Sequence, residues 1–221
     1  MSCLPGAAGE VAEVSVPRSR RAAGAPRVGL LSLQGDFEKH REALVPLGAD
    51  AVRVSLPEHL PGLDALVVPG GESTTMLRLL DATGLRAGVE RFVREKPVLG
   101  TCAGLILLAK SADRLPQPTL GVLDITAERN AWGRQVHSFT GPVDVAPLGV
   151  AFEGVFIRAP RITRVGRGVE VVATLAGEPV GVLQGRVAAF TFHPELTGDS
   201  RLHAWFLRDV AKLPVRGESK R

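Results

Sequence analysis

Short apolar runs alternate with amphipathic stretches from Val28 to residue 110. Short apolar runs bounded by turn residues are typical of parallel strands that are buried on both faces. The predicted strands are VGLLSL (28–33), AVRVSL (51–56), DALVVPGG (64–71) and PVLGT (97–101). The predicted helices are DFEKHREALVPLG (36–48), TTMLRLLDA (74–82, with Ser73 as a suitable N-cap), GLRAGVERFVREK (84–96) and AGLILLAK (103–110). This βαβα order predicts a doubly wound parallel sheet with helices on both faces.

Strand-like segments dominate the second half of the chain. They are GVLDITAERN (121–130), VDVAPL (143–148), VAFEGVFI (150–157), VEVVATLA (169–176), PVGVLQ (179–184) and VAAFTF (187–192). We expect them to add antiparallel strands to the same sheet. The segment 199–212 carries apolar side chains at near-helical spacing and is expected to be a closing helix.

The pattern divides the chain into one domain and two ends. Residues 1–26 mix Gly, Ala, Pro and Ser without a sustained period, so we expect a disordered N-terminal extension. Residues 28–212 show no internal repeat and no low-complexity segment, and are expected to form one domain. Residues 213–221 are expected to be a polar C-terminal tail.

Composition and charge narrow the class of protein. With 221 residues, 45% of them hydrophobic, the chain is long enough for a buried core, and whole-chain disorder is excluded. The net charge is +4, but the excess basic groups lie at the two ends, which argues against a nucleic-acid-binding domain. Without an apolar run of about 18 residues, no transmembrane helix is expected.

The two cysteines, Cys3 and Cys102, are too few for a disulfide scaffold or a four-thiolate zinc site. They are more naturally interpreted as free thiols in a reducing compartment. Since the N-terminus lacks the pattern of a secretory signal, we expect a cytoplasmic protein with no membrane association.

The strongest chemical signal is Gly100-Thr101-Cys102-Ala103-Gly104, between an apolar strand and an apolar helix. It has the form of a nucleophile elbow with Cys in place of Ser. The glycines relieve crowding at a sharp strand-to-helix turn, and the helix start favours a thiolate. The alternative is a core cysteine flanked by small residues by chance.

The second signal is His193-Pro194-Glu195, directly after the last predicted strand. Residues i and i+2 of an extended segment face the same side, and Pro194 disfavours helical geometry at His193. Glu195 is therefore expected to contact and orient the imidazole. A base with its orienting carboxylate is what a cysteine nucleophile requires.

The third signal is Pro69-Gly70-Gly71-Glu72-Ser73, which follows a predicted strand. Two consecutive glycines allow backbone N–H groups to turn toward an oxyanion. The alternatives are an ordinary strand-to-helix turn or a phosphate-binding loop, although the lysine of a P-loop is missing.

Together these blocks resemble the glutaminase subunits of pyridoxal 5′-phosphate synthase, a branch of the triad glutamine amidotransferases. The resemblance covers essentially all of 28–212. The segments that distinguish this branch are LQGDF (33–37), GGEST (70–74), RNAWGRQ (129–135) and FIRAP (156–160).

The resemblance implies a flavodoxin-like three-layer α/β sandwich, with a mostly parallel central sheet and antiparallel additions. It also implies hydrolysis of L-glutamine to glutamate and ammonia, and delivery of the ammonia to a barrel-shaped synthase subunit in a hetero-oligomeric complex. The resemblance implies that Cys102 is the nucleophile, that His193 is the general acid and base, and that Glu195 orients His193. It implies that glutamine and the oxyanion are contacted by Gly70, Gly71 and Glu72. It also implies that Arg129, Ile157 and Arg158 are further glutamine contacts and that Gln34 lies near the oxyanion site.

The mechanism expected from this resemblance uses backbone N–H groups near Gly71 and Ala103 for the oxyanion. It requires no metal and no organic cofactor. The remaining histidines, His40, His59, His137 and His203, are most simply interpreted as surface or helix residues.

Two other functions compete with this hypothesis. One is a stand-alone triad amidase or peptidase on the same fold, and the other is a non-catalytic binding module. Trp132 and His137 depart from the usual family residues, and both are expected near the partner-facing or substrate-facing region.

Overall fold

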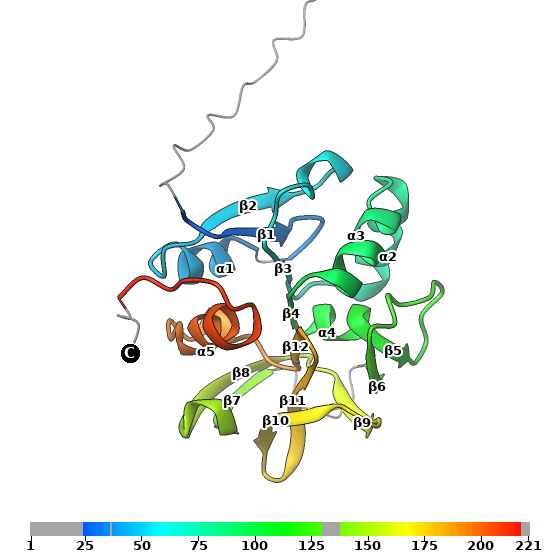
Figure 1. Ribbon diagram of the computed structural model, residues 1–221. Coiled ribbons are helices and arrows are strands. Elements are labelled where there is room, and N and C mark those ends of the chain that lie inside the picture. The colour runs from blue at the N-terminus through cyan, green and yellow to red at the C-terminus, as the bar shows by residue number, and fades with distance from the viewer. Residues whose placement is uncertain (1–23, 36, 130–137, 218–221) are drawn as a thin grey trace, which may run out of the picture.

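A nine-stranded sheet forms the centre of the protein and contains strands from both the first and the second half of the chain. The computed structural model describes residues 24–35, 37–129 and 138–217, so most of the predicted extension 1–26, as well as Trp132 and His137, lies outside the described residues. The sheet order is β2-β1-β3-β4-β12-β11-β10-β7-β8. The expected α/β fold with a three-layer arrangement is confirmed (Figure 1).

Five strands of this sheet are parallel and four are antiparallel. The parallel strands are β1 (Arg27–Leu31), β2 (Asp50–Val54), β3 (Ala65–Val68), β4 (Val98–Thr101) and β12 (Val187–Phe190). The antiparallel strands are β7 (Ser138–Val145), β8 (Val150–Ile157), β10 (Glu170–Leu175) and β11 (Glu178–Gln184). Every residue of β3, β4 and β12 is buried, as the continuous apolar runs predicted.

Helices cover both faces of the parallel half (Figure 1). Helices α2 (Ser73–Ala82), α3 (Arg86–Glu95) and α4 (Ala103–Leu108) pack on one face. Helices α1 (Phe37–Leu44) and α5 (Arg201–Trp205) pack on the other, and a π-helical turn, Phe206–Val210, continues α5. Each face thus has its own hydrophobic core. No helix among the described residues is long and apolar enough to cross a membrane.

Three local expectations were wrong. The second-half strands do not all join one sheet, because β6 (Leu123–Glu128) forms a separate three-stranded sheet with β5 (Ala109–Ala112) and β9 (Arg161–Val165). Helix α4 ends at Leu108, where the chain turns into β5. The N-cap of α2 is Glu72, whose carboxylate accepts from the N–H groups of Thr74 and Thr75, and Ser73 is the first helical residue.

The parallel register places the ends of three neighbouring strands side by side. In β4, Gly100 lies opposite Val68 of β3, and Thr101 lies opposite Phe190 of β12. The segments that follow these strands therefore leave the sheet at one edge. They are the PGG loop, the elbow at Cys102 and the HPE segment.

Gly104 allows α4 to lie directly against β3. A Cβ at this position would come within 1.9 Å of the carbonyl oxygen of Val68, the last residue of β3. Only a residue without a side chain fits this contact.

We expect Gly104→Ala to lower the free energy of unfolding by about 3 kcal/mol, because α4 must move away from β3. Gly88→Ala in α3 is the matched control. Its Cβ would meet only the flexible end of Leu60, at 2.7 Å. The gain in helix propensity offsets that contact, so the control should change stability by less than about 1 kcal/mol. Urea unfolding measures both values, and equal losses would contradict the close-packing account.

Candidate active site

Cys102 occupies a strained turn between β4 and α4. Its backbone has φ 49° and ψ −107°, a conformation that side-chain-bearing residues rarely adopt. Its N–H donates to the carbonyl of Phe190 in β12, at 2.9 Å, which holds the turn against the sheet. The residue is 6% exposed, and Sγ lies 3.8 Å from the carbonyl oxygen of Ile157. The geometry is that of a nucleophile elbow.

His193 and Glu195 meet as predicted, but by a different backbone path. The imidazole Nδ1 lies 2.7 Å from Glu195 Oε1. Glu195 does not continue an extended segment, because Pro194–Leu196 forms a short 3₁₀ turn that begins directly after His193. The N–H of His193 donates to the carbonyl of Val155 in β8, at 2.8 Å. The antiparallel half of the sheet thus helps to hold the histidine.

The environment of His193 favours its protonated form. Burial opposes the charge, but interactions with Cys102 and Glu195 outweigh it and raise the pKa of His193 to about 10. A hydrogen bond between the imidazole and the Cys102 side chain is one of the interactions that raise this pKa. The structure therefore brings the three predicted triad residues together, as an imidazolium between a sulfur atom and a carboxylate.

The PGG loop lies against the triad. A Cβ on Gly70 would come within 2.4 Å of His193 Cε1, so only glycine lets the loop pass this close to the imidazole. Gly71 has φ 156° and follows in the same loop. Ala103 is the first residue of α4, where a backbone N–H has no acceptor within its own helix. These positions suit donors to an oxyanion.

Gln34, Glu72 and Arg129 form a second polar group beside the triad. Gln34 Oε1 accepts from the N–H of Glu72, at 3.3 Å, and Arg129 Nη2 donates to Glu72 Oε1, at 3.1 Å. The Arg129 guanidinium also donates to the carbonyl of Arg114, at 2.9 Å. The carboxylate and the guanidinium expected to bind substrate therefore pair with each other here.

Arg158 stands apart from this group. It has φ 44° directly after β8, and its side chain is exposed. Among the described residues, no carboxylate pairs with its guanidinium. Its neighbour Ile157 faces the triad through the backbone carbonyl near Cys102. The sequence therefore located both residues, but only Ile157 is in direct contact with the triad.

Sequence reasoning missed two residues near the triad. His40 and His203 were interpreted as surface or helix residues. Both lie in helices, and both side chains are fully buried, so neither is at the surface. His40 Nε2 lies 3.4 Å from Glu195 Oε2. Both histidines end segments that resemble the family, LSLQGDFEKH and FTFHPELTGDSRLH, but no role was inferred for them there, and their place on the buried face of a helix is the signal that could have indicated one.

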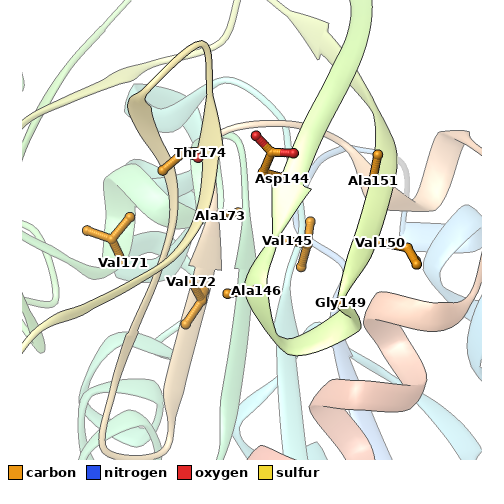
Figure 2. A pocket seen from close by; sticks show the side chains of 10 residues that line it. All are labelled: Asp144, Val145, Ala146, Gly149, Val150, Ala151, Val171, Val172, Ala173 and Thr174. Atoms are coloured by element: carbon orange, nitrogen blue, oxygen red, sulfur yellow. The ribbon is translucent and has the colours of Figure 1, made fainter.

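A separate hollow of about 320 Å³ lies between β7, β8 and β10, away from the triad (Figure 2). Its lining is mainly aliphatic, with Asp144 and Thr174 as polar residues, and contains no nucleophile. The candidate active site is therefore at the edge of the parallel strands, where the chemistry-bearing side chains gather.

Comparison with known proteins gives a consistent result. The model of the SNO glutamine amidotransferase family matches residues 30–212. A "Pyridoxal 5′-phosphate synthase subunit PdxT" from Thermus thermophilus is 55% identical over 183 residues, covering 81% of this chain and 95% of that protein. One of the same title from Thermotoga neapolitana is 50% identical over 186 residues, covering 83% of this chain and 99% of that protein.

Solved structures agree with this similarity. A structure described as "Crystal structure of glutamine amidotransferase" has a TM-score of 0.80 and is 52% identical, covering 84% of this chain and 99% of that one. A putative GMP synthase subunit from Thermoplasma acidophilum has a TM-score of 0.63 at 18% identity, which shows a shared fold.

We expect Cys102→Ala to lower the pKa of His193 below about 10, because the variant lacks the sulfur that stabilises the imidazolium. An NMR titration of the histidine ring signals measures the shift. Cys3→Ala is the matched control and should leave the pKa unchanged. An unchanged pKa in Cys102→Ala would show that the sulfur and the imidazole do not interact.

We expect Glu72→Gln to reduce stability in a pH-dependent way. Burial raises the pKa of Glu72, but hydrogen bonds from Thr75 and Thr74 outweigh it and lower the pKa from 4.5 to about 2. A lowered carboxylate pKa stabilises the fold above about pH 4.5, and this stability is lost as the pH falls toward 2. The side chain is 39% exposed, so we expect a difference below about 1 kcal/mol. Denaturant unfolding of both proteins from pH 6 to pH 2 measures it, and a difference independent of pH would contradict this account.

Proposed function

The chain belongs to the SNO glutamine amidotransferase family, and on that basis we propose that it is the glutaminase subunit of a pyridoxal 5′-phosphate synthase. It hydrolyses L-glutamine to L-glutamate and ammonia, and the ammonia serves the synthase subunit. The observation that carries the proposal is the strained Cys102 within reach of His193, which in turn binds Glu195 at 2.7 Å.

The first half of the reaction forms a thioester. The Cys102 thiolate attacks the side-chain amide carbon of glutamine, and the carbonyl oxygen takes the negative charge. Backbone N–H groups near Gly71 and Ala103 stabilise this oxyanion. The His193 imidazolium then gives its proton to the amide nitrogen, the C–N bond breaks, and ammonia leaves.

The second half releases glutamate. Neutral His193 takes a proton from a water molecule, which attacks the thioester carbon. The C–S bond breaks and returns the thiolate, while His193 is again protonated. Glu195 keeps Nδ1 of His193 protonated, so that Nε2 is the nitrogen that exchanges the proton.

Glu72 and Arg129 suit the amino-acid end of the substrate. Free glutamine carries an α-ammonium and an α-carboxylate, which complement a carboxylate and a guanidinium. In the structure these two side chains are paired at 3.1 Å. Glutamine would replace this pair with one ion pair to each side chain, with Gln34 beside Glu72.

Ammonia transfer requires a partner protein. The relatives are named as synthase subunits, which implies a second subunit that builds the cofactor. We propose that this partner is barrel-shaped and that the two form a hetero-oligomer in the cytoplasm. The glutaminase half-reaction itself needs no metal and no organic cofactor.

The test measures ammonia release from glutamine with and without the synthase subunit. We expect release in the complex, and a loss of at least about 10³-fold in Cys102→Ala, because this variant lacks the nucleophile. Cys3→Ala is the matched control and should retain full activity. A glutamine-like electrophile should label Cys102 and leave Cys3 unmodified.

Two outcomes would contradict the proposal. Hydrolysis of other amides or peptides by the isolated chain, without glutaminase activity in the complex, would favour the stand-alone amidase. Failure of both hydrolysis and labelling would favour a non-catalytic binding module.

A further inference from the structure

Two buried histidines lie behind the triad, and the mechanism above does not use them. His40 comes from α1 and His203 from α5, helices that cover the same face of the sheet (Figure 1). Both side chains are fully buried. A buried polar group without partners costs about 1–3 kcal/mol, so the contacts of these two rings indicate what they do.

Their contacts form a line that ends at the catalytic carboxylate. His203 Nε2 lies 2.9 Å from His40 Nδ1, and His40 Nε2 lies 3.4 Å from Glu195 Oε2. His40 Nε2 also lies 3.2 Å from Oγ1 of Thr101, the residue before the nucleophile. In the described part of the chain, Glu195 Oε2 accepts no hydrogen bond, and His40 Nε2 faces it at 3.4 Å as a charge contact. The carboxylate is thus held between His193 on one oxygen and His40 on the other.

The neighbours of the two rings determine where their protons lie. Burial and the nearby His40 lower the pKa of His203 to about 3, against the opposing charges of Glu195 and Asp199, so His203 is neutral. If His203 donates its Nε2–H to His40 Nδ1, a neutral His40 carries its proton on Nε2, facing Glu195 Oε2.

The opposite arrangement of two neutral rings is unfavourable. It would point a lone pair of His40 at the carboxylate and leave the N–H of His203 Nδ1 buried without a partner. A protonated His40 would also direct its Nε2–H at Glu195, but it would donate Nδ1–H to His203 and so leave the Nδ1–H of His203 without a partner. In the favourable neutral state a proton therefore lies between His40 and the carboxylate.

We propose that His40 and His203 are positioning residues for the glutaminase reaction: His203 orients His40, and His40 fixes the carboxylate of Glu195 so that Oε1 faces His193. This inference rests on the proposed function of the triad. A carboxylate fixed at both oxygens cannot rotate away from the imidazole during the two proton transfers, and a preorganised orienter keeps the base aligned for both.

The test uses two variants of His40 in complex with the synthase subunit. We expect His40→Phe to lower kcat about 10- to 100-fold, within the range that general acid–base catalysis contributes, and to change KM for glutamine less than about twofold. His40→Gln offers an amide N–H near the Nε2 position and should recover most of the loss. In the full chain, His40→Phe should also lower the pKa of His193, because a mobile carboxylate supports the imidazolium less.

A control separates positioning from stability. Leu44 lies one turn after His40 in α1 and is also fully buried, so Leu44→Ala should lower stability by about 2–5 kcal/mol. Its kcat and the pKa of His193 should stay at the wild-type values. A similar fall of kcat and pKa in Leu44→Ala and His40→Phe would overturn the proposal.

A double variant tests whether His203 acts on Glu195 through His40. His203→Leu should lower kcat in wild-type background but change it less than about twofold in His40→Phe, since its effect passes through His40. Additive losses would overturn that order. If wild-type protein in the complex releases no ammonia, the proposed function fails. If wild type is active and His40→Phe retains its kcat and its His193 pKa, only this inference fails.

Discussion

The register between three parallel strands is the constraint on which the site depends. Because Gly100 pairs with Val68 and Thr101 pairs with Phe190, three chain segments leave the sheet at the same level. A slip of one residue would turn the side chains of β4 to the opposite faces and remove the elbow from its partners. The complete burial of these strands opposes such a slip, since it would place apolar side chains wrongly in both cores. The cores and the site are therefore fixed by the same pairing.

Strain and close packing at this edge are supported by the surrounding structure. A residue with φ 49° at Cys102 costs of the order of 1–3 kcal/mol. The turn is held by the bond from Cys102 N–H to Phe190 and by the burial of every residue of α4. Glycines at positions 70 and 104 remove the atoms that would otherwise separate the loop, the helix and the imidazole. A rigid scaffold thus carries a locally unfavourable backbone conformation.

The buried charge of Glu195 is likewise stabilised by the surrounding structure. Burial alone would raise the pKa of Glu195, yet His40 and His193 lower it, so the carboxylate stays ionised inside the protein. The cost of burying its charge is met by His40 of α1 and by His193, which directly precedes the 3₁₀ turn. At the rim, Glu72 caps α2 and pairs with Arg129, so the polar groups of the pocket have partners before any substrate arrives. Contacts within the protein therefore hold both the Glu195 carboxylate and the Glu72–Arg129 pair in place.

Much of this was readable from local patterns. Apolar runs indicated the parallel strands, because burial on both faces requires them. The elbow, the HPE segment and the PGG loop indicated Cys102, His193 and Gly70, because their chemistry needs particular residues at fixed short spacings.

Other features depended on contacts between distant segments. The three-stranded sheet arises because β9 pairs with β6 across the chain, and the cap of α2 is Glu72 because its carboxylate reaches two free N–H groups. His40 and His203 are 163 residues apart, and no local pattern shows that two helices bring them together behind Glu195. The sequence by itself determined which groups can react, since reactivity belongs to residue types and short motifs. Only the tertiary structure decided which buried groups support them, since those contacts exist only after the sheet has aligned its strands and both faces have been covered.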